Sequence, residues 1–398
     1  MGLHKKLSAI FSISILVFGC ALVSSAQDTA TIYLQRAEKL YSKIWRLYRT
    51  PGFTGLFSEN FPSRHSDTLT YFQGGGVKEK EVSFLWPFSG MFSATNVLLK
   101  FPSERQKYLP YLDTLIIGVE KYRDTSRSPD GYQAYPVEFE KADRYYDDNG
   151  LVGIEYMESF FNTGDSTYLK RAREVFKFII SGWSNDLGGG VTWLEGHNDQ
   201  KPACSNGTAT LVALKIYQGN KDQYYLKWGE RFYNWINKNL KDSATGVISN
   251  DKKPNGIVNR TFWTYNTGFM LESAVMLYKF TGNKRYLNDA RSFAKNAYNH
   301  FAKVSSSGKI SLLDMPWFLT VLFRGYEALY YVDGNTKYIR AVMKNVNDAW
   351  KQKDQYGLVY KNWYGSKDEM TSSKWLLDEA CIVEFYARMS LLERRLKK

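Results

Sequence analysis

The chain has 398 residues, of which 44% are hydrophobic and 23% charged, a globular balance that argues against disorder. Its formal net charge is +13, from 53 Lys and Arg against 40 Asp and Glu, but no long basic run is present. A solvated basic surface is therefore favoured over a nucleic-acid site. The four histidines show no metal-ligand spacing, so we expect neither a metal site nor a cofactor.

The N-terminus has the pattern of an export signal. Met1–Lys6 carries two lysines, an apolar stretch covers Leu7–Val23, and Ser24–Ala26 supplies the small residues that a signal peptidase reads. This pattern predicts a signal peptide over residues 1–26, one catalytic domain over 27–398, and a periplasmic or extracellular protein. A lipid anchor through Cys20 is the alternative. No later stretch is long and apolar enough to span a bilayer.

An internal repeat organises the remainder of the chain. Each copy is a polar turn, usually with Gly, followed by an aromatic–aliphatic pair that opens an amphipathic run. The copies recur about every 50 to 60 residues, a period that indicates a repeated helical hairpin. The clearest copies are Thr163–Leu169, Gly219–Leu226, Thr281–Leu287 and Asp333–Ile339.

Helical periodicity around these copies predicts twelve helices in six hairpins. The first helices of the hairpins are expected at Ile32–Tyr48, Arg105–Lys121, Tyr168–Ile180, Tyr224–Asn239, Tyr286–Phe301 and Tyr338–Lys351. Their partners are expected at Phe88–Leu99, Asp148–Phe161, Ser205–Tyr217, Thr267–Phe280, Trp317–Val332 and Leu376–Leu392.

The two sets of helices differ in composition. The first helices are richer in Lys, Arg and Glu, which suits an outer solvated ring, whereas the partners are more apolar and suit an inner ring. This pattern predicts an all-α fold, an (α/α)6 barrel, with an open solenoid as the alternative. The segments from each first helix to its partner are long and aromatic. We therefore expect the functional site on the barrel face that carries these long segments.

Three of the long segments carry candidate chemistry. Arg144–Asn149 places two consecutive carboxylates, Asp147 and Asp148, before an inner helix, where a plain N-cap role is the alternative. Leu187–Glu195 contains three consecutive glycines and is followed by Lys201–Gly207, and Phe262–Gly268 contributes rings and an amide. Carboxylates, amides and aromatic rings on one face are what a neutral polysaccharide site requires. Cys204 is interpreted as a packed wall residue, because no nearby His is evident to activate it.

The same segments resemble glycoside hydrolase family 76, the bacterial endo-α-1,6-mannanases. The residues that carry the resemblance are Tyr145–Asn149, Gly188–Gly190, Trp193, Asn206, Thr264–Gly268, Trp317 and Arg324–Gly325. The resemblance implies an (α/α)6 barrel and a retaining hydrolase of α-1,6-mannosidic linkages. It matches Asp147 to the nucleophile and Asp148 to the general acid/base. Retention requires two carboxyl groups about 5–5.5 Å apart, which neighbouring residues with divergent side chains can provide.

The expected partner is an α-mannan polysaccharide or oligosaccharide, bound by a monomer. The candidate substrate-binding residues are Tyr146, Asn149, Trp193, Asn206, Trp263, Tyr265, Asn266 and Arg324. For the two tryptophans and for Arg324, a structural role is the alternative. Leu151 departs from the family, which often has an aromatic residue there. Two other functions stay open: a different sugar-active enzyme on this fold, such as another α-mannosidase or an epimerase, and a silent mannan-binding protein.

Overall fold

The computed structural model describes residues 28–63, 82–304, 306, 310–312, 314–361, 363 and 372–397. The expected signal peptide over residues 1–26, with Cys20, lies outside these ranges. In the part of the chain that is described, no helix combines the length and the apolar character that crossing a membrane requires.

Twelve α-helices lie in the described ranges, and each overlaps one predicted from the sequence. Six are buried around most of their circumference: α2 (Leu85–Leu98), α4 (Tyr146–Thr163), α6 (Ala203–Asn220), α8 (Thr264–Thr281), α10 (Pro316–Asp333) and α12 (Leu376–Leu396). The others bury one stripe each: α1 (Thr29–Leu47), α3 (Arg105–Glu120), α5 (Ser166–Ser181), α7 (Gln223–Asn239), α9 (Lys284–Phe301) and α11 (Lys337–Ala349).

The burial patterns explain the two rings. In α9 the buried residues Tyr286, Ala290, Phe293, Ala294 and Ala297 recur every three or four positions, as on a helix with one face in solvent. In α8 nearly every residue from Thr264 to Leu277 is buried, as in a helix surrounded by others. The predicted division into outer and inner helices is confirmed.

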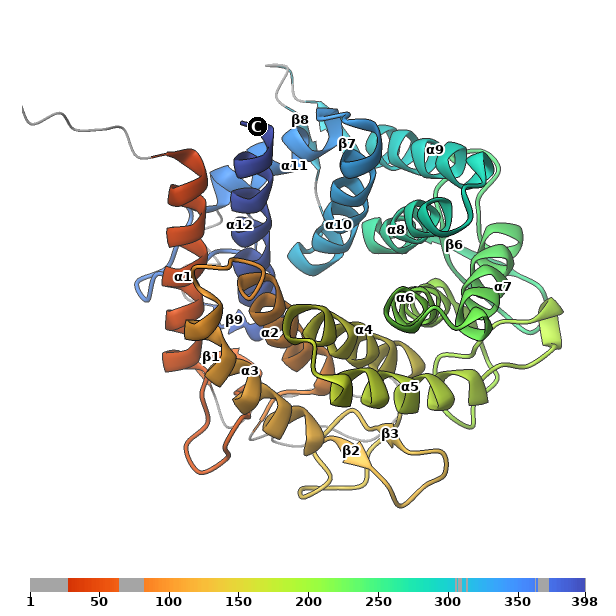
Figure 1. Cartoon of the computed structure of the whole chain (residues 1–398), viewed down its shortest axis with the longest axis horizontal. Helices are drawn as coiled ribbons and strands as arrows, with labels where there is room; N and C mark the ends of the chain where they lie inside the picture. The colour runs from red at the N-terminus through yellow and green to blue at the C-terminus, as the bar shows by residue number, and fades with distance from the viewer. Residues whose placement is uncertain are drawn as a thin grey trace, which may run out of the picture.

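The inner ring is closed. Each inner helix contacts the next in the order α2, α4, α6, α8, α10 and α12, and α12 contacts α2 again. Figure 1 shows this ring, with α1 beside α12 where the first and last helices meet. The closed (α/α)6 barrel is therefore correct, and the open solenoid is excluded.

The pairing within hairpins differs from the expectation by one helix. The sequence grouped each outer helix with the inner helix that follows it, but each inner helix packs with the outer helix that follows, as in α4 with α5 and α6 with α7. The reason is the length of the connection, because a short turn forces consecutive helices to lie antiparallel. The outer helix left over, α1, packs against α12.

The repeated motif builds these short turns. Gly164, which ends α4, has a left-handed backbone (φ 78°), and the next residue, Asp165, caps α5 by accepting a hydrogen bond from the backbone N–H of Thr167. Gly282 and Asn283 do the same between α8 and α9. The polar Gly turns of the sequence repeat are thus helix caps.

All long segments meet at the opposite end of the barrel, where the inner helices begin. Their described residues form four small antiparallel sheets, which the sequence did not predict as such. The strands are β1 (Asn60–Phe61) with β9 (Lys374–Trp375), β2 (Arg123–Asp124) with β3 (Gly131–Tyr132), β4 (Lys201–Pro202) with β5 (Ser249–Lys252) and β6 (Val258–Phe262), and β7 (Ala302–Val304) with β8 (Ile310–Leu312).

Candidate active site

The two consecutive aspartates lie in the first turn of α4, at the end of the barrel that carries the long segments. Both side chains are partly exposed. The preceding residue, Tyr145, is extended and makes no side-chain cap. Neither aspartate forms an ion pair with any Lys or Arg among the described residues. The pair is therefore free to act on a ligand rather than serving a structural ion pair.

Asp147 has two side-chain hydrogen-bond donors. The indole Nε1 of Trp193 donates to its Oδ2 at 3.1 Å, and the thiol of Cys204, in the first turn of α6, donates to the same carboxylate. Burial raises the pKa of Asp147, while these two donors oppose the rise because they stabilise the ionised form. Asp147 also accepts a hydrogen bond from the backbone N–H of Asp148 at 3.1 Å.

Asp148 has the more strongly perturbed carboxyl group. Burial raises its pKa well above the ordinary value, and the neighbouring charge of Asp147 raises it further. When the surroundings of two neighbouring carboxyl groups push their pKa values apart, one can act as a base and the other as an acid. The pKa of both carboxyl groups is raised, and that of Asp148 is raised more, because the side-chain donors that oppose the effect of burial act on Asp147.

The segment Leu187–Glu195 lies beside the start of α4 and is joined to it by an isolated β-bridge. The backbone N–H of Tyr146 donates to the carbonyl of Trp193 at 2.9 Å, and Tyr145 forms an antiparallel bridge with Leu194. Next to them, the buried guanidinium of Arg144 donates from Nε to Glu195 Oε2 at 2.8 Å. These contacts fix where the Trp193 indole lies relative to Asp147.

Asn149 and Asn206 do not offer an amide to a ligand, which corrects their interpretation as substrate contacts. Both side chains are fully buried. The amide of Asn149 bonds to the backbone N–H and carbonyl of Tyr132, at 2.7 and 2.8 Å. The amide of Asn206 does the same to Val191, at 2.8 and 2.9 Å. Each holds a long segment against the start of an inner helix.

Tyr146 is also structural. Its ring is buried and stacks on Phe178 of α5, with centroids 4.8 Å apart and an interplanar angle of 21°. The side chain therefore faces the outer ring of helices, away from the barrel axis, and its interpretation as a substrate contact is wrong. Leu151, the departure from the family pattern, is buried in the hydrophobic core.

Two of the predicted aromatic residues, Trp263 and Tyr265, lie in one cluster. Tyr265 packs on Phe318 with centroids 4.3 Å apart and on Trp317 at 5.3 Å, and Trp263 packs on Phe318 at 5.3 Å. The hydroxyl of Tyr265 also bonds to the thiol of Cys204, which connects the cluster to Asp147. Tyr265 and Trp263 thus lie at the predicted end of the barrel.

Two further rings of this cluster, Trp86 and Trp375, were not selected from the sequence. Trp86 meets Trp317 and Trp375 edge to face, at 5.4 and 5.2 Å. Both stand at the start of an inner helix, as Trp263 does, and that position in the repeat was the available signal.

Asn266 is the predicted residue whose side chain still requires a partner. It is 1% exposed, and neither its Oδ1 nor its Nδ2 has a hydrogen-bond partner among the described residues. A buried amide without partners is destabilising by about 1–3 kcal/mol, so a bound hydroxyl or water is expected there.

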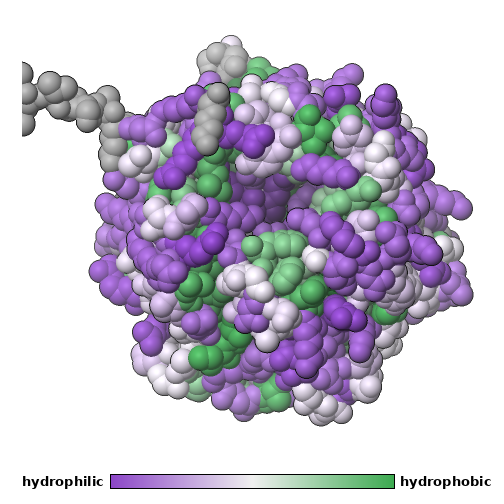
Figure 2. Space-filling view, viewed as in Figure 1, coloured by the Kyte–Doolittle hydropathy of each residue, from purple (hydrophilic) through white to green (hydrophobic). Residues whose placement is uncertain are grey.

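Arg324 lies elsewhere, which corrects its interpretation as a substrate contact of the aspartate site. Its guanidinium donates to Glu384 from Nε and Nη2, both at 2.7 Å, and to Ser93 Oγ at 2.8 Å. It lines a cavity of about 350 Å³ between the C-terminal halves of the inner helices. In the view of Figure 2, which is that of Figure 1, a hydrophilic hollow lies at the centre of the molecule.

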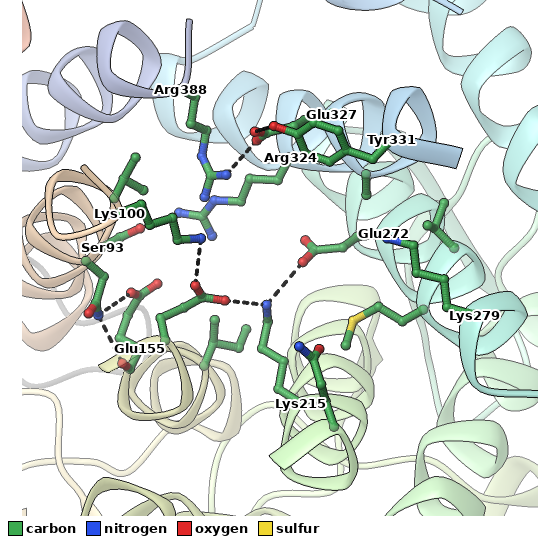
Figure 3. Close-up of a pocket in the computed structure, with 18 of the residues that line it drawn as sticks. Ser93, Lys100, Glu155, Lys215, Glu272, Lys279, Arg324, Glu327, Tyr331 and Arg388 are labelled. Atoms are coloured by element: carbon green, nitrogen blue, oxygen red, sulfur yellow. Dashed lines mark hydrogen bonds and ion pairs between the residues drawn. The ribbon is translucent and has the colours of Figure 1, made fainter. Parts of the chain in front are cut away.

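The charges of this cavity neutralise one another (Figure 3). Glu158 pairs with Lys100 and Lys215, at 2.8 and 2.7 Å, and Glu327 pairs with Arg388 at 2.6 Å. Burial raises the pKa of Glu155 to about 7, but this carboxyl is held by Asn96. Among the described residues, no second carboxylate without a basic partner lines the cavity with it. The aspartate end is therefore the better candidate for acid–base chemistry.

The comparison with protein families decides the assignment. The model of glycosyl hydrolase family 76 matches residues 66–394 of the chain. The chain belongs to this family.

Among the curated relatives of this family 76 chain is mannan endo-1,6-alpha-mannosidase DCW1 of Candida glabrata. The two are 30% identical over 176 residues, which cover 38% of this chain and 39% of the relative. The match therefore spans about two fifths of the relative's length.

Solved structures resemble the chain over most of its length. A family 76 glycoside hydrolase (mannosidase) from Bacteroides thetaiotaomicron VPI-5482 is 25% identical, with a TM-score of 0.81 and 92% of this chain and 100% of that chain covered. The α-1,6-mannanase of Salegentibacter sp. HEL1_6 has a TM-score of 0.72 at 22% identity, over 90% of this chain and 99% of that chain. That structure is an inactive variant, with two consecutive aspartates replaced by alanine, in complex with α-1,6-mannotetrose.

Proposed function

We propose that this family 76 member is a retaining hydrolase that cleaves α-1,6-mannosidic linkages within mannan chains. Asp147 attacks the anomeric carbon, and Asp148 protonates the leaving oxygen. Asp148 then takes a proton from the water that releases the glycosyl group from Asp147. The observation that carries this proposal is the unequal environment of the two carboxylates, since only Asp147 has the Trp193 and Cys204 donors.

The comparisons support the substrate and the residues. The curated relative is named for endo-1,6-α-mannosidase activity, and the Salegentibacter enzyme is described as inactive when two consecutive aspartates are replaced. In this chain, Asp147–Asp148 is the one place where two aspartates are consecutive. The aromatic cluster that contains Trp263 and Tyr265, with the unpartnered amide of Asn266, supplies the surface on which a mannose ring stacks and forms hydrogen bonds.

The decisive experiment uses linear α-1,6-mannan. The wild-type chain is expected to release oligosaccharides with new reducing ends, and NMR of the first product is expected to show the α anomer. Asp147→Asn and Asp148→Asn should each lower kcat by about a thousandfold or more while the melting temperature stays near wild type. Asp222→Asn is the matched control, because Asn caps α7 as well as Asp does.

Four results would contradict the proposal. A first product with the β anomer excludes retention. Wild-type rates in either aspartate variant exclude the assigned roles. Binding of mannan by calorimetry without new reducing ends indicates a silent binding protein, and sugar conversion without hydrolysis indicates an epimerase.

We also propose that the protein is exported, with cleavage after Ala26, and acts as a monomer. The lysines, the apolar stretch and the small residues of the first 26 positions support export. Mass spectrometry of the secreted protein tests the cleavage site, and lipid attached to Cys20 would instead establish the lipid anchor. Light scattering coupled to size-exclusion chromatography tests the monomer.

A further inference from the structure

Lys201, in β4, has an unusual environment for a lysine. The residue is 1% exposed, and its ammonium donates to three backbone carbonyls, those of Ser184 at 3.1 Å, Asp186 at 2.6 Å and Gly189 at 2.7 Å. An ammonium has three N–H donors, so its hydrogen-bonding capacity is fully used.

The three carbonyls belong to one tight loop. Leu187 and the three glycines that follow it all have positive φ, and the carbonyls of Ser184 and Asp186 before this turn and of Gly189 within it all accept from the Lys201 ammonium. A Cβ on Gly189 or Gly190 would lie 2.4 Å from the ring of Trp183 or 2.7 Å from that of Trp235, so the loop is pressed against these indoles. Converging carbonyl dipoles repel one another, and a cation at their focus removes that repulsion.

The loop continues directly into the segment that contacts the proposed nucleophile. Val191 follows the last glycine and is held by Asn206. Two residues later, Trp193 accepts a hydrogen bond from the backbone of Tyr146 and places its indole N–H 3.1 Å from Asp147 Oδ2. Lys201 itself lies two residues before the start of α6. One ammonium therefore joins the start of an inner helix to the segment that carries Trp193.

We propose that Lys201 is a positioning residue for the hydrolysis reaction: it clamps the loop 184–190 so that the Trp193 indole stays on the nucleophilic carboxylate. The inference rests on the proposed function, because it assigns a role in that reaction. Lys201 contacts no reacting atom in this arrangement. It acts through Trp193.

The test is a double-mutant cycle with Lys201→Met and Trp193→Phe, assayed on linear α-1,6-mannan. Each single variant is expected to lower kcat by about tenfold to a hundredfold with a smaller change in KM. Each is also expected to move the acid limb of the kcat/KM profile to higher pH, since loss of the indole donor raises the pKa of Asp147. In the Trp193→Phe background, Lys201→Met should have little additional effect on kcat or on the acid limb.

The control is Lys215→Met, which removes another buried lysine, one that pairs with Glu158 and Glu272 in the charged cavity. It is expected to lower the melting temperature without moving the acid limb. If Lys201→Met does not fold, Lys201→Gln, which keeps a polar donor, replaces it in the same cycle.

The outcomes separate the two proposals. If the wild-type chain releases no reducing ends from mannan, the proposed function fails. If the wild type is active but Lys201→Met keeps its kcat and acid limb, or lowers kcat equally in both backgrounds, the positioning role is wrong and Lys201 is merely structural.

Discussion

The side-chain amide of Asn206 accepts a hydrogen bond from the backbone N–H of Val191 at 2.8 Å and donates one to its carbonyl at 2.9 Å. Asn149 makes the same pair of bonds to Tyr132. Both asparagines are the fourth residue of an inner helix. The structural repeat therefore includes the long segments: the fourth residue of each of these two inner helices is hydrogen-bonded to the backbone of the long segment that precedes the helix.

The same position is used in two other inner helices. Thr267 in α8 accepts a hydrogen bond from the backbone N–H of Ile248 at 3.1 Å, and Glu379 in α12 accepts one from that of Val359 at 3.1 Å. Because each bond ties a long segment to its own helix, the end of the barrel that carries the aspartates is fixed by these four side chains.

Asn206→Ala is the first prediction. The N–H and carbonyl of Val191 lose their buried partner, so the free energy of unfolding should fall by about 2–4 kcal/mol. Trp193 should shift, which lowers kcat. Urea denaturation and steady-state kinetics on α-1,6-mannan measure the two effects. A higher KM with unchanged stability would instead restore Asn206 as a substrate contact.

Arg324→Met is the second prediction. The variant leaves Glu384 charged and buried with one cationic partner fewer, and breaking such a pair is destabilising by about 3–5 kcal/mol. Arg324→Met combined with Glu384→Gln should recover part of this loss, because no uncompensated charge remains. A substrate-binding role for Arg324 predicts the opposite, a change in KM with no change in the denaturation midpoint.

The architecture could be predicted from the sequence because the signals for helices, apolar periodicity and composition, are local. Apolar periodicity located twelve helices, and their composition separated outer from inner. The predicted hairpins paired each inner helix with the outer helix before it, whereas it packs with the outer helix after it. Periodicity carries no information on which neighbour a helix packs against. The short turns at Gly164 and Gly282 contained that information.

The site was predicted less completely, because a residue's type does not reveal what its side chain faces. Asn149 and Asn206 have side-chain amides that could bind a ligand. Both amides are instead hydrogen-bonded to backbone groups of residues more than ten positions away in the sequence. Arg324 lies near the aromatic motif in sequence but two helical turns deeper in the barrel than Trp317. Trp193, by contrast, was selected for its ring, and the structure shows its N–H at Asp147.

Glu155→Gln is the third prediction and concerns pH. Burial raises the pKa of Glu155 to about 7 in the folded chain, above its ordinary value of 4.5. Below both values the carboxyl is protonated whether folded or unfolded. As pH rises from about 4.5 to 7, the unfolded chain ionises first, and the folded state loses stability, at most about 3 kcal/mol from this group.

Gln at this position cannot ionise, so the variant should be more stable than wild type at pH 8 and close to it at pH 4.5. Its carbonyl can still accept the hydrogen bond from Asn96 Nδ2. Melting temperatures across this pH range give the comparison, with Glu38→Gln on the outer surface as the control. An equal effect at both pH values would mean that Glu155 ionises normally in the folded chain.

Cys204→Ala and Cys204→Ser form the last prediction. The thiol donates to Asp147 and bonds to the hydroxyl of Tyr265, so it opposes the rise that burial imposes on the pKa of Asp147. Ala removes that donor, and kcat/KM on the acid side should fall about threefold to tenfold, the effect of one hydrogen bond of about 0.5–1.5 kcal/mol. Ser keeps a donor and should retain the wild-type acid limb. Both variants leave Asp148 untouched, so the alkaline limb should not move in either. If Ala and Ser behave alike on the acid side, the Cys204 side chain fills space beside Asp147 and does not tune it.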